Sequence, residues 1–293
     1  MLTWAGNHIF RIVAALATLL VAVSGFSASV TKDLSAPRKE LPQIAIILDD
    51  LGYNRKVGEQ ALQLPGPVTY AIIPFTPYSK IFAEQAKDRN RQVILHLPME
   101  SSDPNRALDK GGLSSELDEA EIRSRIHQAI KDVPHIVGMN NHMGSQLTSN
   151  VEVMHWLMQE LQQQPLFFID SMTHPHSVAN TSAKHYNIPS LKRDVFLDNV
   201  QTESNIDRQF NRLVNLAKKK GHAIGIGHPY PATLAYLEKA LPKLEQLGVE
   251  LVETSKLVAA YGTTVNQPVD IKELMRWIVA MPAPQSQRLN FSN

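Results

Sequence analysis

Short, uninterrupted apolar runs rich in β-branched side chains recur along the chain. They lack the alternation of apolar and polar residues that is typical of a strand with one solvent-exposed face. They therefore predict strands buried on both faces, as in a parallel sheet covered by helices. Longer segments with amphipathic helical spacing separate them, which makes about seven or eight strand–helix repeats. The expected strands are 44–48, 68–73, 91–97, 136–140, 166–171, 190–197, 223–227 and 249–252.

The intervening segments predict helices that cover this sheet. Ser114 and Ser115 with Asp118 and Glu119 are typical of a helix N-terminus, Gly221 is typical of a C-terminal cap, and Pro98 is expected to end its strand. Because the repeats continue without a break in composition, we predict one α/β domain, either barrel-like or doubly wound. The expected helices are 78–89, 117–131, 151–163, 179–186, 206–220 and 233–247.

The two ends of the chain differ from this pattern. Residues 1–29 have a positive start at Arg11, an apolar stretch and then small residues, which is the layout of a secretory signal peptide. An uncleaved N-terminal anchor is the alternative, and without it we expect no stable membrane span. Residues 30–42 are polar and predict a linker, and 263–293 predict a tail with one amphipathic helix.

Composition narrows the chemistry. The chain is 43% apolar and 19% charged, with a formal net charge of +1, which gives no sign of a nucleic-acid partner. A neutral small molecule or a carbohydrate polymer fits this balance better. The chain has no cysteine, so any metal ion must be bound by His, Asp or Glu.

Polar side chains stand at the ends of the apolar runs. Each alone has a structural explanation, such as a hydrogen-bonded core histidine or a helix cap at Asp170 and Ser171. Because the carboxyl ends of parallel strands converge on one face, we expect these polar side chains to form one site. His174 and His176 are a second candidate for metal binding. The residues at these strand ends are Asp49, Asp50, His96, His142, Asp170, Asp198 and His228.

Six separated motifs together resemble the divergent polysaccharide deacetylase family. This resemblance implies a single distorted β/α barrel of about seven parallel strands over residues 43–262, and a site with one divalent metal ion, for which zinc is expected. The motifs are Leu48-Asp49-Asp50, His96-Leu97-Pro98-Met99-Glu100, Asn140-Asn141-His142-Met143-Gly144-Ser145, Ile169-Asp170-Ser171, the segment from Arg193 to Asn199, and Gly227-His228-Pro229.

The resemblance also implies the residues that bind the metal. Asp50 and His96 resemble the first two metal ligands. The usual second ligand histidine is replaced by Glu100, so either Glu100 or His142 is the third ligand. We favour His142, because imidazole suits zinc and the loop that follows it is suited to present the side chain.

The remaining roles follow from the same resemblance. Asp49 resembles the general base and His228 the general acid, with Asp170 or Asp198 expected to hold His228. Arg193 is the nearest substitute for the arginine of ordinary deacetylases. The residues expected to contact substrate or support the site are Glu100, Asn141, Ser145, Ser171, Arg193 and Asp198.

We therefore expect an exported metal-dependent hydrolase that removes N- or O-acetyl groups from cell-wall or surface carbohydrate, in the periplasm or cell envelope. Two alternatives belong to other classes. A catalytically silent metal- or glycan-binding protein on the same scaffold would explain the replacement at Glu100. A glycosidase would pair Asp50 with Asp170 or Asp198, but it leaves the histidines without a role.

The N-terminal pattern generates a prediction about export. If the leader is removed, N-terminal sequencing of the mature protein should find a start between about residues 28 and 30. An intact Met1 on protein recovered from the cytosol would contradict export.

Overall fold

The structure is a computed structural model, and it describes residues 41–262 and residue 276. The predicted leader, most of the predicted linker and almost all of the predicted tail lie outside the described residues. The strands are β1 (Gln43–Leu51), β2 (Thr69–Ile72), β3 (Gln92–Met99), β4 (Ile136–Met143), β5 (Phe167–Asp170), β6 (Ser190–Lys192), β7 (Val195–Phe196), β8 (His222–Gly227) and β9 (Glu250–Leu251).

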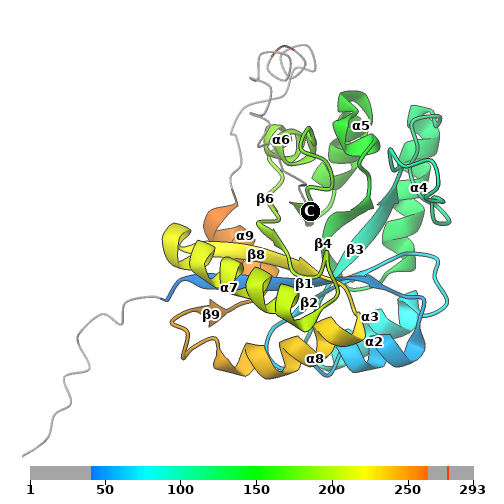
Figure 1. Ribbon diagram of the computed structural model, residues 1–293. Coiled ribbons are helices and arrows are strands. Elements are labelled where there is room, and N and C mark those ends of the chain that lie inside the picture. Colours follow the sequence, from blue (N-terminus) through cyan, green and yellow to red (C-terminus); the bar gives the residue numbers. More distant parts are fainter. Residues whose placement is uncertain (1–40, 263–275, 277–293) are drawn as a thin grey trace, which may run out of the picture. The chain divides into compact units, whose positions relative to one another are not determined.

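Helices α2, α3 and α8 lie below β1 and β2, and α4, α5 and α6 lie beside β3 to β6 (Figure 1). The α-helices are α2 (Arg55–Ala61), α3 (Ser79–Asp88), α4 (Glu119–Asp132), α5 (Val151–Gln162), α6 (Ala179–His185), α7 (Glu203–Lys220), α8 (Pro231–Ala240) and α9 (Thr254–Tyr261). Two short 3₁₀ turns, η1 (Leu147–Ser149) and η2 (Leu241–Lys243), complete the described elements.

All paired strands are parallel, in the order β6-β5-β4-β3-β2-β1-β8-β7, with β9 added to the start of β1. One stretch, 190–196, supplies both ends of this order. Its backbone switches partner at the break, because Arg193 N donates to Asp170 O of β5 while Asp194 N donates to Ile224 O of β8. The sheet therefore curls back on itself, and the distorted parallel β/α barrel is confirmed.

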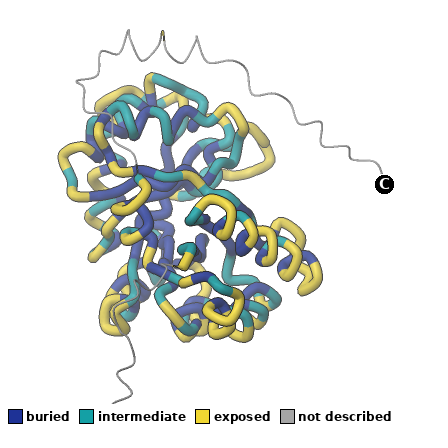
Figure 2. Tube along the Cα trace, turned by 90° about the vertical axis from the view of Figure 1, so that its left-hand side faces the viewer, coloured by how far each residue is buried: buried dark blue, intermediate teal, exposed yellow. Residues whose placement is uncertain are grey.

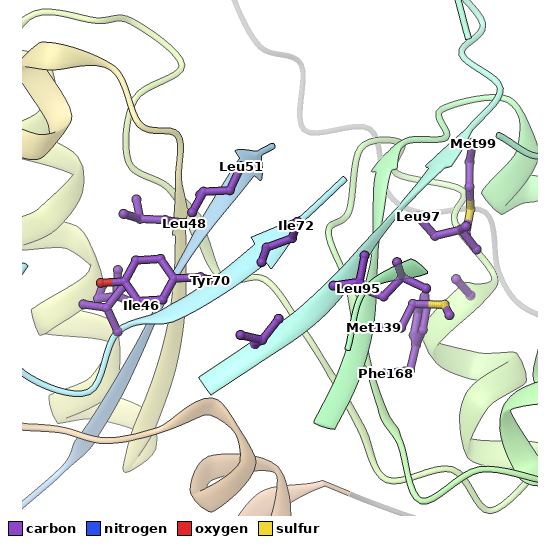
Figure 3. Close-up of a cluster of buried hydrophobic side chains, with 14 of the residues drawn as sticks. Ile46, Leu48, Leu51, Tyr70, Ile72, Leu95, Leu97, Met99, Met139 and Phe168 are labelled. Atoms are coloured by element: carbon purple, nitrogen blue, oxygen red, sulfur yellow. The ribbon is translucent and has the colours of Figure 1, made fainter. Parts of the chain in front are cut away.

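Two apolar clusters occupy the two faces of the curled sheet. Ile44, Ile46 and Leu48 of β1 belong to the larger cluster between sheet and helices, and Figure 3 shows part of that layer along neighbouring strands. Ala45 and Ile47 belong to the smaller cluster inside the curl, which α9 joins through buried side chains. Both faces of β1 are therefore buried, as its unbroken apolar run predicts. Figure 2 shows the buried strands surrounded by more exposed helices and loops.

The strand and helix boundaries depart from the sequence predictions in a few places. Pro98 does not end its strand, because β3 continues to Met99 and the Pro98 carbonyl accepts a bond from Leu113 N. Helix α4 is capped by Asp118, whose side chain accepts from Glu121 N in a capping box, rather than by the preceding serines. Helices α2 and α9 were not predicted, since both are short.

The C-terminal cap of α7 agrees with the prediction. Gly221 caps α7 in the left-handed region, with φ of 87°. Within the described part of the chain, no helix is both long and apolar enough to cross a membrane.

The turn after β1 depends on Gly52, which has φ of 137°. A Cβ added there would lie 2.1 Å from Thr76 Oγ1. We expect Gly52→Ala to lower the free energy of unfolding by about 2–3 kcal/mol, through backbone strain and this clash. Urea denaturation measures the change.

Gly221→Ala is the matched control, because the nearest atom to its added Cβ is Tyr261 Oη at 3.7 Å. It should lose only about 1 kcal/mol, from the left-handed backbone alone. Equal losses in the two variants would contradict the clash at Gly52.

Candidate metal centre

The end of β1 is bulged where its two carboxylates lie. Leu48 pairs with Tyr70 and Leu51 pairs with Ile72, so Asp49 and Asp50 share the space of one partner residue. Asp50 takes a left-handed φ of 60°, a conformation that aspartate tolerates better than most residues. In a regular strand the two side chains would point to opposite faces. The bulge lets both carboxylates face the same site.

The other site residues follow from the alternation of the strands. Ile94 of β3 and Ile226 of β8 point into the interior of the curl. His96 and His228 come two residues later, so they point the same way in the next layer up. The polar site is therefore the continuation of the apolar interior, at the carboxyl ends of the strands.

Three ligand atoms meet at this level. Asp50 Oδ1 lies 2.9 Å from His142 Nδ1 and 3.1 Å from His96 Nε2. The two ring nitrogens are 3.1 Å apart. Ligand atoms of a four-coordinate zinc ion, at bond lengths of about 2.0 Å, lie about 3.3 Å apart. Two imidazoles and one carboxylate thus fit a zinc-like divalent ion, as the sequence motifs imply.

His96 is oriented by Asn140 of β4. Its Nδ1 lies 2.7 Å from Asn140 Oδ1, and Asn140 Nδ2 donates to Asp49 Oδ1 at 2.9 Å. The amide oxygen can only accept, so His96 carries its proton on Nδ1 and leaves the Nε2 lone pair free for a metal. Asn140 lies within a quoted motif but was not assigned a role from the sequence.

His142 is bracketed by two carboxylates. Its Nδ1 faces Asp50, and its Nε2 lies 3.2 Å from Asp109 Oδ2. The second oxygen of Asp109 accepts from Tyr53 Oη. Asp109 lies in an irregular segment between β3 and α4, where no strand end or motif identifies it in the sequence.

The electrostatics of the site reflect these contacts. Burial alone would raise the pKa of Asp50, but the neighbouring His142 and His96 outweigh it and lower that pKa well below its usual range in the metal-free site. Burial lowers the pKa of His142, but its bonds to Asp109 and Asp50 raise it to about 9 overall. At Asp49, burial dominates and raises the pKa, although the charge of His96 opposes this.

His228 stands on the opposite side of Asp50, with Nε2 at 3.9 Å from Asp50 Oδ2. Its Nδ1 lies 2.9 Å from Asp198 Oδ1, and Asp198 Oδ2 accepts from His228 N and Thr233 Oγ1. Burial lowers the pKa of His228, but the bond to Asp198 and the charge of Asp50 raise it to about 9. Asp198 therefore holds this imidazole in place and favours its protonated form.

Asp170, the other predicted partner of His228, makes its contacts elsewhere. Its side chain accepts from Met172 N at 2.8 Å and from Ser177 Oγ at 2.8 Å, so it organises the loop before α6. Phe168, two residues earlier, belongs to the outer cluster. By alternation Asp170 also faces outward, which is why this strand-end carboxylate does not reach His228.

Glu100 does not join the three ligand atoms. Its carboxylate accepts from Ser115 N at 2.7 Å and from Ser115 Oγ at 2.6 Å. Between the two residues considered as a third ligand, the structure brings His142 to the cluster and leaves Glu100 as a loop anchor.

The remaining predicted residues support the walls of the site. Arg193 donates to Ser171 O at 2.7 Å and to Met172 O at 2.8 Å, and burial lowers its pKa to about 10. Asn141 accepts from Ser171 N at 2.9 Å. Ser145 binds the Ser102 backbone N–H at 2.9 Å.

Within residues 41–262, His174 and His176 gather no third metal-binding side chain.

Comparisons with known proteins agree with this fold. Residues 46–258 match the family described as divergent polysaccharide deacetylase. An uncharacterised protein of Escherichia coli K12, YibQ, is 38% identical over 218 residues, which cover 74% of this chain and 67% of the relative. An uncharacterised protein of Haemophilus influenzae is 37% identical over 215 residues, covering 73% and 76%.

One solved structure is also similar in fold. It is an uncharacterised protein from Agrobacterium tumefaciens C58, with a TM-score of 0.72 and 22% identity. The match covers 76% of this chain and 91% of that protein.

The geometry generates a prediction about metal binding. His142→Ala should abolish stoichiometric zinc binding, because it removes one of three ligand atoms. Glu100→Gln should retain zinc, because its carboxylate binds Ser115 instead. Elemental analysis after dialysis measures both, and the reverse pattern would show that Glu100 is the ligand.

Proposed function

The chain belongs to the divergent polysaccharide deacetylase family, and we propose on that premise that it is an exported metal-dependent hydrolase acting on acetylated carbohydrate. The observation that carries the proposal is the placement of Asp49 and His228. Each stands beside the Asp50, His96 and His142 cluster, with Asp49 near His96 and His228 near Asp50. A metal ligand set flanked by a base and an acid is what amide or ester hydrolysis requires.

Asp50, His96 and His142 would hold the metal. A zinc ion bound by such ligands activates water and stabilises negative charge on an acyl oxygen. Two imidazoles and a carboxylate, without a thiolate, are ligands that suit zinc and also neighbouring divalent ions. Zinc is proposed because this combination of ligands is common at zinc sites.

Asp49 is proposed as the general base. It is buried, and burial raises its pKa towards the range in which a carboxylate takes up a proton effectively. The Asn140 amide donates to one of its oxygens at 2.9 Å and fixes the orientation of the carboxylate. Its other oxygen lies 3.6 Å from His96 Nε2, and so faces the metal cluster, where it can receive the proton of the attacking water.

His228 is proposed as the general acid. Asp198 binds its Nδ1, so Nε2 is the nitrogen directed at the site and carries the proton to be donated. The raised pKa keeps the imidazole protonated at neutral pH. Its proton would go to the departing sugar nitrogen or oxygen as the bond to the acetyl group breaks.

A polar cleft lined partly by the loop that follows His142 supports a carbohydrate substrate. It has a volume of about 340 Å³, and Met143 and Ser145 form part of its lining. Hydroxyl groups of Ser101, Ser102 and Thr173 line it together with Arg106. Hydroxyl-rich walls of this kind can form hydrogen bonds with sugar hydroxyls. The formal net charge of the chain is only +1, which is compatible with a neutral glycan.

Export to the periplasm or cell envelope is part of the proposal and rests on the leader-like pattern of residues 1–29. In that compartment the acetylated polymers of the cell wall or surface are the available carbohydrate.

A catalytically silent binding protein is the second candidate, favoured by Glu100 in place of a ligand histidine. The glycosidase alternative loses support, because Asp170 binds its own loop and Asp198 is engaged by His228. Neither carboxylate is free to pair with Asp50 across a sugar.

Catalysis by Asp49 and His228 is tested by substitution. Asp49→Asn and His228→Ala should keep near-stoichiometric zinc, yet release acetate from an N-acetylated glycan about a hundred- to ten-thousand-fold more slowly. Acetate release and bound zinc are measured on the same samples.

The control is Glu84→Gln, which removes a carboxylate that binds His135 on the surface, and it should keep full activity. If the unmutated protein binds zinc and glycan but releases no acetate from N- or O-acetylated polymers, the silent binding protein replaces the enzyme.

A further inference from the structure

We propose that Asp109 is a positioning residue that orients His142 for the metal and ties the segment 101–113 to the metal centre. This inference rests on the metal site proposed above. It assigns a residue from an irregular segment that neither the motifs nor the strand ends identify.

The orientation of the His142 ring is determined from both sides. Asp50 Oδ1 faces Nδ1 at 2.9 Å, and Asp109 Oδ2 faces Nε2 at 3.2 Å. A carboxylate can only accept a hydrogen bond, so Asp109 requires the proton to be on Nε2. Binding of a metal ion would replace the Nδ1 proton that binds Asp50 Oδ1, and the Nδ1 lone pair would then be directed at the metal held between Asp50 Oδ1 and His96 Nε2.

Asp109 is itself held in place. Tyr53 Oη donates to its second carboxylate oxygen, and its backbone carbonyl accepts from Gly112 N at 2.9 Å. The side chain is 20% exposed, so water competes little for the bond to His142. A carboxylate with both oxygens engaged is a fixed acceptor rather than a mobile surface charge.

The two ligand histidines receive different partners. His96 binds the neutral amide of Asn140, and the carboxylate of Asp49 lies 3.6 Å from its other ring nitrogen. His142 receives the carboxylate of Asp109. Asp50 and Asp109 therefore place a carboxylate at each ring nitrogen of His142. A carboxylate on a ligand histidine also raises the basicity of the coordinating nitrogen.

The same contact links the segment to the centre. Its start is tied to the loop after β4, because Ser102 N donates to Ser145 Oγ at 2.9 Å. Its far part reaches the site through Asp109, and Lys110 lies over the Phe75 ring at 6.0 Å. Ser101, Ser102 and Arg106 of this segment line the polar cleft. Metal binding to His142 should therefore stabilise one wall of that cleft.

The test measures zinc affinity by competition with a chromophoric chelator. Asp109→Ala should weaken zinc binding about 10–100-fold, the usual effect of removing the partner of a ligand histidine. Asp109→Asn should recover much of the affinity, because an amide oxygen can still accept from Nε2 of His142. Tyr53→Phe removes only the support of Asp109 and should have a smaller effect.

Asp103→Ala is the matched control. It removes a carboxylate from the same segment, and the hydrogen bonds of Asp103 stay within that segment. It should leave zinc affinity unchanged. The absorption spectrum of the cobalt-loaded protein should change in Asp109→Ala but not in this control, because the ligand geometry at His142 changes.

Hydrogen exchange gives an independent readout of the link to the segment. In the unmutated protein, zinc should slow exchange over residues 103–112, and this protection should be lost in Asp109→Ala. Thermal unfolding of the metal-free variants checks that each is folded.

Zinc affinity within twofold of the unmutated protein in a folded Asp109→Ala variant, with an unchanged cobalt spectrum, would overturn the inference. If the unmutated protein itself binds no zinc, the proposed metal site fails first, and that result is distinct.

Discussion

The site depends on the two-residue alternation of parallel strands whose two faces are both buried. Along β1, β3 and β8, residues that point into the curl form an apolar layer, and the next inward residue on each strand is polar. The apolar layer lies beneath the polar one and keeps water from reaching it from below. A shift of one residue in the register of any strand would turn its polar group outward, so the packing of the core sets the geometry of the site.

This arrangement places charges where they are costly unless they are paired. Asp49 and His96 are each only 2% exposed, and an isolated charge at that depth would be strongly disfavoured. Hydrogen bonds and ion pairs offset this cost. One series of contacts runs from Asp49 through Asn140 to His96, and another from Asp50 through His142 to Asp109. Three side chains lie at contact distance, with His96 held by Asn140 and His142 held by Asp109, so the site is organised before any metal arrives.

Much of this could be read from the sequence, and the exceptions have physical causes. Strand ends in a parallel fold converge, so Asp50, His96 and His142 could be grouped with the other strand-end residues without a structure, and the family resemblance then indicated these three as metal ligands. In a strand as short as β5, the sequence does not show which residues point inward. Asp170 is therefore expected in the site, although its side chain accepts from Ser177 in the loop before α6. Asp109 could not be found, because its position depends on how an irregular segment folds back over the strand ends.

The most direct test of the account is the position of a metal ion in zinc-loaded crystals, located by anomalous diffraction at the zinc edge. The account predicts one strong peak bonded to Asp50 Oδ1, His96 Nε2 and His142 Nδ1, at distances of about 2.0–2.2 Å. A peak bonded to Glu100 or to the His174 and His176 pair, or no peak at the strand ends in excess zinc, would contradict it.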